Sequence, residues 1–141
     1  MRSSCERSRR TKIAGSDGAM IPRLARIATW VAVVALAVLS LLPRDQMLRT
    51  GASGWSEHAV AYAGTMTLAA LGYGGRLALV WPCAALVAYA GLLELAQALS
   101  PGRSPGIVDF LAGAAGAVLA AAIAARVQRV VATRRTRSSA T

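Results

Sequence analysis

Four apolar stretches, separated by short polar segments, dominate the middle of the chain. They cover about residues 24–42, 57–73, 77–99 and 107–125. A membrane-spanning helix needs about 20 mostly apolar residues, so the third and fourth stretches are long enough and the first two lie near the lower limit. The pattern therefore predicts an all-α fold, a polytopic membrane helix bundle with four transmembrane helices.

The first stretch also fits a second interpretation, a cleaved secretory signal. A basic leader precedes the apolar run, and Ala35-Leu36-Ala37 has the small residues of a cleavage site. The apolar run continues past this site to Leu42, which is more typical of an anchor that stays in the protein. We therefore expect the first stretch to be a retained transmembrane helix.

Basic residues gather at the two ends of the chain. Of the 16 Lys and Arg residues, seven lie in residues 1–26 and five in residues 126–141. We expect a disordered basic tail over residues 1–23, with Met20 as an alternative start, then a membrane domain over residues 24–125. The last segment, from residue 126 onward, is expected to be a second basic tail.

The distribution of positive charge predicts the orientation of the bundle. With both termini in the cytoplasm, the inner side carries 13 Lys and Arg residues and the outer side carries three, Arg44, Arg49 and Arg103. The positive-inside rule therefore favours an N-in/C-in topology, which four spans permit. The net charge of +10 belongs mostly to the tails, and only 5% of the residues are aromatic, so we expect no nucleic-acid partner.

The few polar side chains within and beside the spans converge on the outer side in this topology. An ionisable group inside a span is a candidate functional site. Glu94 lies about 7 Å inside the end of its helix, so this carboxylate needs a partner, and Arg103 or His58 is the expected one. The candidate site consists of His58, Tyr62, Glu94, Gln97, Arg103 and Asp109.

Each of these residues also has a purely structural interpretation. Asp109 would favour a helix N-terminus, His58 would be an interfacial histidine, and Arg103 would reach the lipid head groups. The glycines and alanines of the fourth stretch lie on stripes at helical spacing, which lets helices pack closely in lipid. This stretch is therefore expected to be a packing helix, and its glycines need no functional role.

Three motifs in this region resemble the VanZ-like family. They are Glu57-His-x-x-x-Tyr62, Glu94-x-x-Gln97-x-x-x-Pro101-Gly-Arg103 and Asp109-Phe-Leu-Ala-x-x-x-Gly116, and together they cover 60 of the 141 residues. The family consists of small bacterial integral membrane proteins and is named after a protein of glycopeptide-resistance clusters linked to teicoplanin tolerance. The candidate residues occupy the matching family positions.

The resemblance implies a multi-pass protein of the bacterial cytoplasmic membrane that contributes to envelope function or glycopeptide tolerance. This chain departs from the family pattern at three places. Gly54-Trp55 stands where many members have Asp-Lys, Ala59 replaces a Phe, and Gly113 replaces an Asn. These departures leave the polar cluster thinner than in the family.

Several kinds of site are excluded by the sequence. One His and two separate Cys residues do not supply the four ligands of a structural zinc site. The glycine-rich segment 72–76 follows no strand and lacks the Lys-Ser/Thr pair of a phosphate loop, and no Gly-x-Ser-x-Gly elbow is present. We therefore expect neither a metal nor a cofactor.

Three roles remain open. In the first, the cluster binds an anionic envelope lipid or a lipid-linked cell-wall precursor, because a guanidinium beside hydrogen-bond donors suits phosphate. In the second, the protein is an intramembrane hydrolase or transferase that acts on lipid head groups, with His58, Glu94 and Asp109 as catalytic residues. In the third, it is a structural membrane subunit without a ligand. Binding ranks above catalysis because the sequence has no recognised catalytic spacing. Membrane lipids are the expected partners. The sequence does not specify the oligomeric state.

Overall fold

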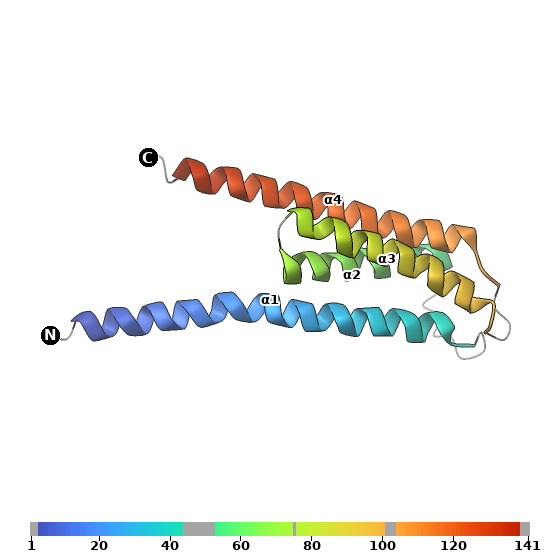
Figure 1. Ribbon diagram of the computed structural model, residues 1–141, viewed down its shortest axis with the longest axis horizontal. Coiled ribbons are helices and arrows are strands. Elements are labelled where there is room, and N and C mark those ends of the chain that lie inside the picture. The colour runs from blue at the N-terminus through green and yellow to red at the C-terminus, as the bar shows by residue number, and fades with distance from the viewer. Residues whose placement is uncertain (1–2, 44–52, 75, 101–103, 139–141) are drawn as a thin grey trace.

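The computed structural model describes residues 3–43, 53–74, 76–100 and 104–138. In this part, the chain forms four helices and no strand, as the sequence predicts. The helices run alternately in opposite directions, so both termini lie at one end of the bundle (Figure 1). The helices are α1 (Ser3–Leu41), α2 (Gly54–Tyr73), α3 (Arg76–Gln97) and α4 (Ile107–Ser138). We call the end with the chain termini the terminal end and the opposite end the loop end.

Three helical segments are long and apolar enough to cross a membrane. They are Met20–Leu41 in α1, Leu79–Gln97 in α3 and Ile107–Ser138, which is the whole of α4. Helix α2 has 20 residues, enough for about 30 Å at 1.5 Å per residue, but its mean hydropathy is lower. The apolar character of the bundle identifies a membrane protein.

Helices α1 and α4 are longer than the apolar pattern predicts. Helix α1 begins at Ser3 rather than near residue 24, and α4 continues to Ser138 rather than ending near residue 125. The expected disordered tail of residues 1–23 is thus helical from Ser3 onward. In α4, no Gly or Pro follows Gly116, and Arg and Ala have high helix propensity, so this helix has no reason to end where its apolar stretch ends. Helix α1 extends through Gly15, Gly18 and Pro22, and helix propensity does not explain that extension.

Helix α2 is the interior helix of the bundle. It packs against each of the other three helices, most extensively against α4, and lies between α1 and α4 (Figure 1). The core cluster accordingly takes residues from α2, α3 and α4. Its members are Tyr62, Met66, Ala70, Leu79, Leu86, Ala90 and Ala117. A helix whose polar side chains face other helices tolerates a lower mean hydropathy than a helix that faces lipid.

Two glycines set the distances between α2 and its neighbours. A Cβ atom at Gly116 of α4 would overlap the carbonyl oxygen of Ala59 and lie 3.0 Å from its carbonyl carbon. A Cβ atom at Gly72 of α2 would lie 2.9 Å from the backbone nitrogen of Arg26 in α1. These close backbone contacts confirm the prediction that α4 is a packing helix, and they extend the same principle to α1 and α2.

A tight turn joins α2 to α3. Helix α2 ends at Tyr73, as predicted, and Gly74 adopts a φ of 56°, a left-handed value that favours glycine. The N–H of Gly74 donates to the carbonyl of Ala70 at 3.3 Å, which closes the last turn. Pro82 lies in the second turn of α3, where its ring removes one helical hydrogen bond.

Candidate functional site

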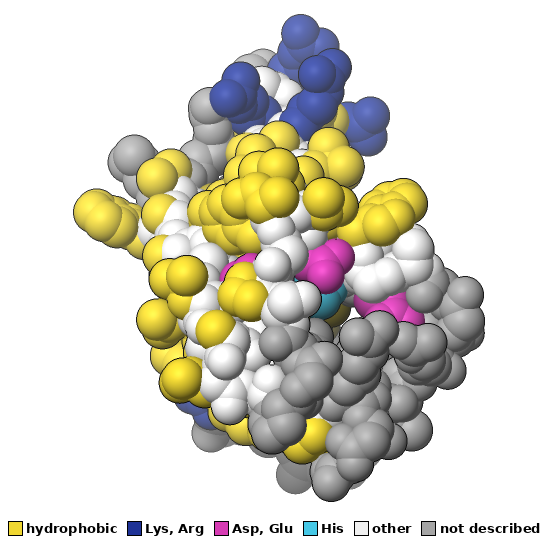
Figure 2. All heavy atoms as spheres, turned by 90° about the vertical axis from the view of Figure 1, so that its right-hand side faces the viewer, with side chains coloured by type: hydrophobic (Ala, Val, Ile, Leu, Met, Phe, Trp, Pro, Cys, Tyr) yellow, Lys and Arg dark blue, Asp and Glu magenta, His cyan; other side chains and the backbone are white. Residues whose placement is uncertain are grey.

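The predicted site residues lie at the loop end, where α2 and α4 begin and α3 ends. Figure 2 views this end and shows acidic and histidine side chains exposed between hydrophobic side chains. The positions come from three helices. Helix α2 contributes His58 and Tyr62, α3 contributes Glu94 and Gln97, and α4 contributes Asp109. The sixth residue, Arg103, lies outside the described residues, as does Pro101 of its motif.

The buried carboxylate of Glu94 holds the start of α4. Glu94 is 7% exposed, and its Oε1 accepts a hydrogen bond from the backbone N–H of Gly106. The carbonyl of Gly106 in turn accepts from the N–H groups of Asp109 at 3.0 Å and Phe110 at 3.1 Å, which begins the helix. A carboxylate at a helix N-terminus also interacts favourably with the helix dipole. The described partner of Glu94 is therefore a backbone amide.

Asp109 brings a second carboxylate to the same place. A Cβ atom at Gly106 would lie 3.3 Å from Asp109 Oδ2 and 3.5 Å from Glu94 Oε1, so both carboxylates border this glycine. A Cβ atom at Gly54 would lie 3.6 Å from Asp109 Oδ1, which places the carboxylate beside the start of α2 as well. Neighbouring carboxylates repel each other and attract cations and hydrogen-bond donors. The cluster therefore accepts hydrogen bonds rather than donating them.

His58 adds an imidazole on the same side of α2. Its Nδ1 lies 3.0 Å from the carbonyl oxygen of Gly54, and a carbonyl only accepts, so Nδ1 carries the hydrogen of this bond. In a neutral ring, Nε2 is then a hydrogen-bond acceptor. His58 makes no hydrogen bond or ion pair to Glu94, so it is not the partner that the sequence suggested. His58 and Asp109 instead meet at Gly54.

Tyr62 and Gln97 are buried beneath the carboxylates and hold helices together. Tyr62 is 3% exposed, and a Cβ atom at Gly113 would lie 2.9 Å from its ring carbon Cδ2. Gly113 thus provides the space for the Tyr62 ring, and an asparagine at this position would collide with it. Gln97 is 2% exposed and donates from Nε2 to Ser40 Oγ of α1 at 2.7 Å. Both side chains face the interior, so they position the site rather than contact a ligand.

Sequence reasoning did not find the residues of α1 that complete the loop end. Ser40 accepts the hydrogen bond of Gln97, and the carbonyl of Leu41 accepts a hydrogen bond from Ser100 Oγ at 3.0 Å. The one available signal was Ser40 itself, a hydroxyl in the last turn of an otherwise apolar stretch. These two bonds tie the end of α3 to the end of α1.

The described residues contain no cluster of three or more His, Cys, Asp and Glu side chains with the geometry of a metal site. Cys83 is a free cysteine in α3, well away from the loop end. The loop-end cluster, which we define as His58, Glu94 and Asp109 around Gly54 and Gly106, is therefore a set of hydrogen-bond acceptors at one end of the bundle. In comparisons with known proteins, no family model, no curated protein and no solved structure matches the chain.

Proposed function

We propose that the chain is a VanZ-like integral membrane protein of the bacterial cell envelope that binds a lipid head group at its loop end. The ligand is an anionic envelope lipid or a lipid-linked cell-wall precursor, a role that would contribute to envelope function or glycopeptide tolerance. The observation that carries the proposal is the hydrogen bond between buried Glu94 and the N–H of Gly106. This bond holds Gly106, three residues after Arg103 in the sequence.

The chemistry of the cluster assigns different parts of a head group to different residues. Arg103 supplies the positive charge, and its guanidinium binds phosphate through two parallel hydrogen bonds. Asp109 and the Nε2 atom of His58 accept hydrogen bonds from the hydroxyl groups of a glycerol or sugar. Carboxylates alone would repel an anion, so the proposal requires Arg103 and uses the acceptors for the uncharged part of the ligand.

The proposal includes the topology. Helix α2 crosses the membrane as a fourth, interior span, and both termini lie in the cytoplasm, because 13 of the 16 Lys and Arg residues then lie inside. In a background without Cys5 and Cys83, we expect Ser53→Cys to react with a membrane-impermeant maleimide in intact cells. The matched variant Ser138→Cys is expected to react only after the cells are opened. The reverse pattern, or reaction of both in intact cells, would contradict the topology.

The binding proposal is tested by replacing Arg103. We expect Arg103→Ala to weaken the binding of anionic lipid at the loop end about tenfold, because a charge-assisted bidentate hydrogen bond is lost, so that less anionic lipid copurifies in mild detergent. The measurement is mass spectrometry of the retained lipids, normalised to protein. Arg103→Lys keeps the charge without the planar fork and is expected to retain an intermediate amount.

Arg49→Ala is the matched control, because Arg49 is also one of the cations on the proposed outer side and belongs to none of the three motifs. It is expected to retain lipid as the unmodified protein does. Equal lipid retention by Arg103→Ala and the unmodified protein would reject the proposal. Equal losses in both variants would show that general surface charge, rather than a site, retains the lipid.

A further inference from the structure

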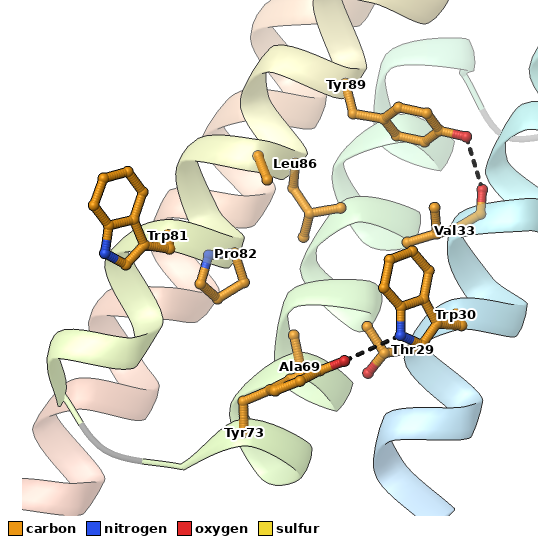
Figure 3. A pocket seen from close by; sticks show the side chains of 10 residues that line it. Thr29, Trp30, Val33, Ala69, Tyr73, Trp81, Pro82, Leu86 and Tyr89 are labelled. Carbon is orange, nitrogen blue, oxygen red and sulfur yellow. Dashed lines mark hydrogen bonds between the residues drawn. The ribbon is translucent and has the colours of Figure 1, made fainter.

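A second feature lies near the turn between α2 and α3, away from the loop-end cluster. A cavity of about 630 Å³ opens between α1, α2 and α3, a size within the range of small-molecule sites. Figure 3 shows Trp30 and Tyr73 on one side of the cavity and Trp81 with Pro82 on the other, with Leu86 between them. We call this cavity the aromatic groove.

The polar atoms that line the aromatic groove are mostly engaged within the protein. Trp30 Nε1 donates to the Tyr73 hydroxyl at 3.1 Å, and the Tyr89 hydroxyl donates to the carbonyl of Val33 at 3.0 Å (Figure 3). Thr29 Oγ1 donates to the carbonyl of Ala25 at 2.7 Å. A polar ligand would find few partners here. The groove therefore suits a hydrocarbon chain.

The aromatic groove opens to the outside of the bundle. Trp30 is 63% exposed and Trp81 is 79% exposed, so the two indole rings form an outer rim. Helices α1 and α3, which carry them, are both long and apolar enough to cross a membrane. On the proposed topology this rim faces the bilayer, and a chain that fills the groove enters sideways from the lipid.

A cation lies next to Tyr73, one of the residues that line the groove. The guanidinium carbon of Arg26 lies 5.3 Å from the centre of the Tyr73 ring, and its Nε donates to the carbonyl of Gly72 at 2.7 Å. Among the described residues, neither Nη group of Arg26 has a hydrogen-bond acceptor. An arginine has five N–H donors, so four remain for a ligand. The Arg26 side chain is thus held by Gly72 and Tyr73, while its Nη groups are available to bind an anion.

We propose that the aromatic groove binds one acyl chain of an anionic phospholipid and that Arg26 binds the phosphate of the same lipid. Each part of the site matches one part of the molecule: an apolar groove open to the bilayer takes the chain, and an anchored guanidinium next to Tyr73 takes the anion. Tryptophan and tyrosine prefer the interfacial depth at which an acyl chain meets its head group. The site is independent of the loop-end cluster, since it uses other residues away from that cluster.

Tryptophan fluorescence tests the proposal, because Trp30 and Trp81 line the groove. In a Trp55→Phe background, these two residues are the only tryptophans. The protein is reconstituted into vesicles of phosphatidylcholine with increasing amounts of phosphatidylglycerol, with bromine on the acyl chains of one lipid at a time. We expect brominated phosphatidylglycerol to quench more strongly than its share of the lipid predicts, with a preference of about tenfold over phosphatidylcholine.

Three variants separate the parts of the site. Arg26→Gln is expected to lower the preference to near one, whereas Arg23→Gln, which changes the neighbouring arginine one turn away, is expected to keep it. Ala85→Phe fills the groove and is expected to remove the excess quenching while leaving the arginine in place. Arg103→Ala is expected to have no effect, so the outcome is independent of the proposed loop-end function.

Equal quenching by the two brominated lipids in the Trp55→Phe protein would overturn the proposal. Retention of the preference in Ala85→Phe would also overturn it, because the lipid would then lie outside the groove. Arg26 packs against Gly72, so Arg26→Gln is first checked for folding by circular dichroism. If this variant does not fold, the comparison of the two lipids and the Ala85→Phe variant still decide the question.

Discussion

Replacing Gly116 with leucine is expected to lower the free energy of unfolding by about 3 kcal/mol or more. The Cβ atom alone would overlap the carbonyl oxygen of Ala59. Because the obstacle is backbone, no change of side-chain rotamer relieves it, and α2 and α4 must move apart. These two helices make the most extensive contact in the bundle, so their separation affects the whole core. Thermal unfolding in mild detergent, followed by circular dichroism, measures the loss.

Gly64→Leu is the matched control for this prediction. It makes the same substitution in α2, but a Cβ atom at Gly64 would have no neighbour within 4 Å. Gly64 is exposed on the outside of the bundle, and leucine has the higher helix propensity, so this variant is expected to lose no stability. A similar loss in both variants would show that the added leucine side chain itself, rather than the contact with Ala59, determines the effect.

Replacing Glu94 with alanine is expected to lower the free energy of unfolding by about 2 kcal/mol. The N–H of Gly106 loses the carboxylate that accepts its hydrogen bond, and the first turn of α4 loses its connection to α3. On the proposed function, the same variant also loses bound lipid, because Gly106, three residues after Arg103 in the sequence, is no longer held by Glu94. Thermal unfolding and the amide exchange rate of Gly106 measure the structural part.

Glu94→Gln separates the acceptor from the charge. Its side-chain oxygen still accepts from Gly106, so it is expected to keep more than half of the stability that Glu94→Ala loses. Equal losses in the two variants would mean that the negative charge matters and the hydrogen bond does not. An unchanged exchange rate of Gly106 in Glu94→Ala would contradict the anchoring role.

The apolar pattern located the helices but not all of their ends. The end of α2 at Tyr73 and the start of α4 at Ile107 agree with the prediction, because Gly74 and Gly106 interrupt the chain at the same places where the apolar stretches change. The start of α1 at Ser3 and the end of α4 at Ser138 do not agree. Hydropathy reports where a helix leaves the lipid, and it does not specify where the helix itself stops.

For the candidate site, the sequence predicted where the residues lie but not which hydrogen bonds they make. Alternating helices bring Glu94, Asp109 and His58 to one end, and this follows from chain direction alone. The bonds of the site depend on the rotation of each helix about its axis, which no spacing along one helix specifies. Glu94 therefore has a backbone amide as its partner, and Gln97 has a serine in α1, where the side-chain motifs gave no indication of either.

The interior position of α2 has a consequence for biogenesis. Helix α2 is not among the segments apolar enough to cross a membrane by composition, yet it packs most extensively against α4, which the ribosome makes after the other three helices. On the proposed topology, α2 leaves the translocon together with α3 as a hairpin closed by the turn at Gly74. Until α4 leaves the translocon, the face of α2 that carries Ala59 and Tyr62 contacts lipid or an insertase instead of α4. Slow release of α4 would then expose this nascent intermediate to membrane proteases.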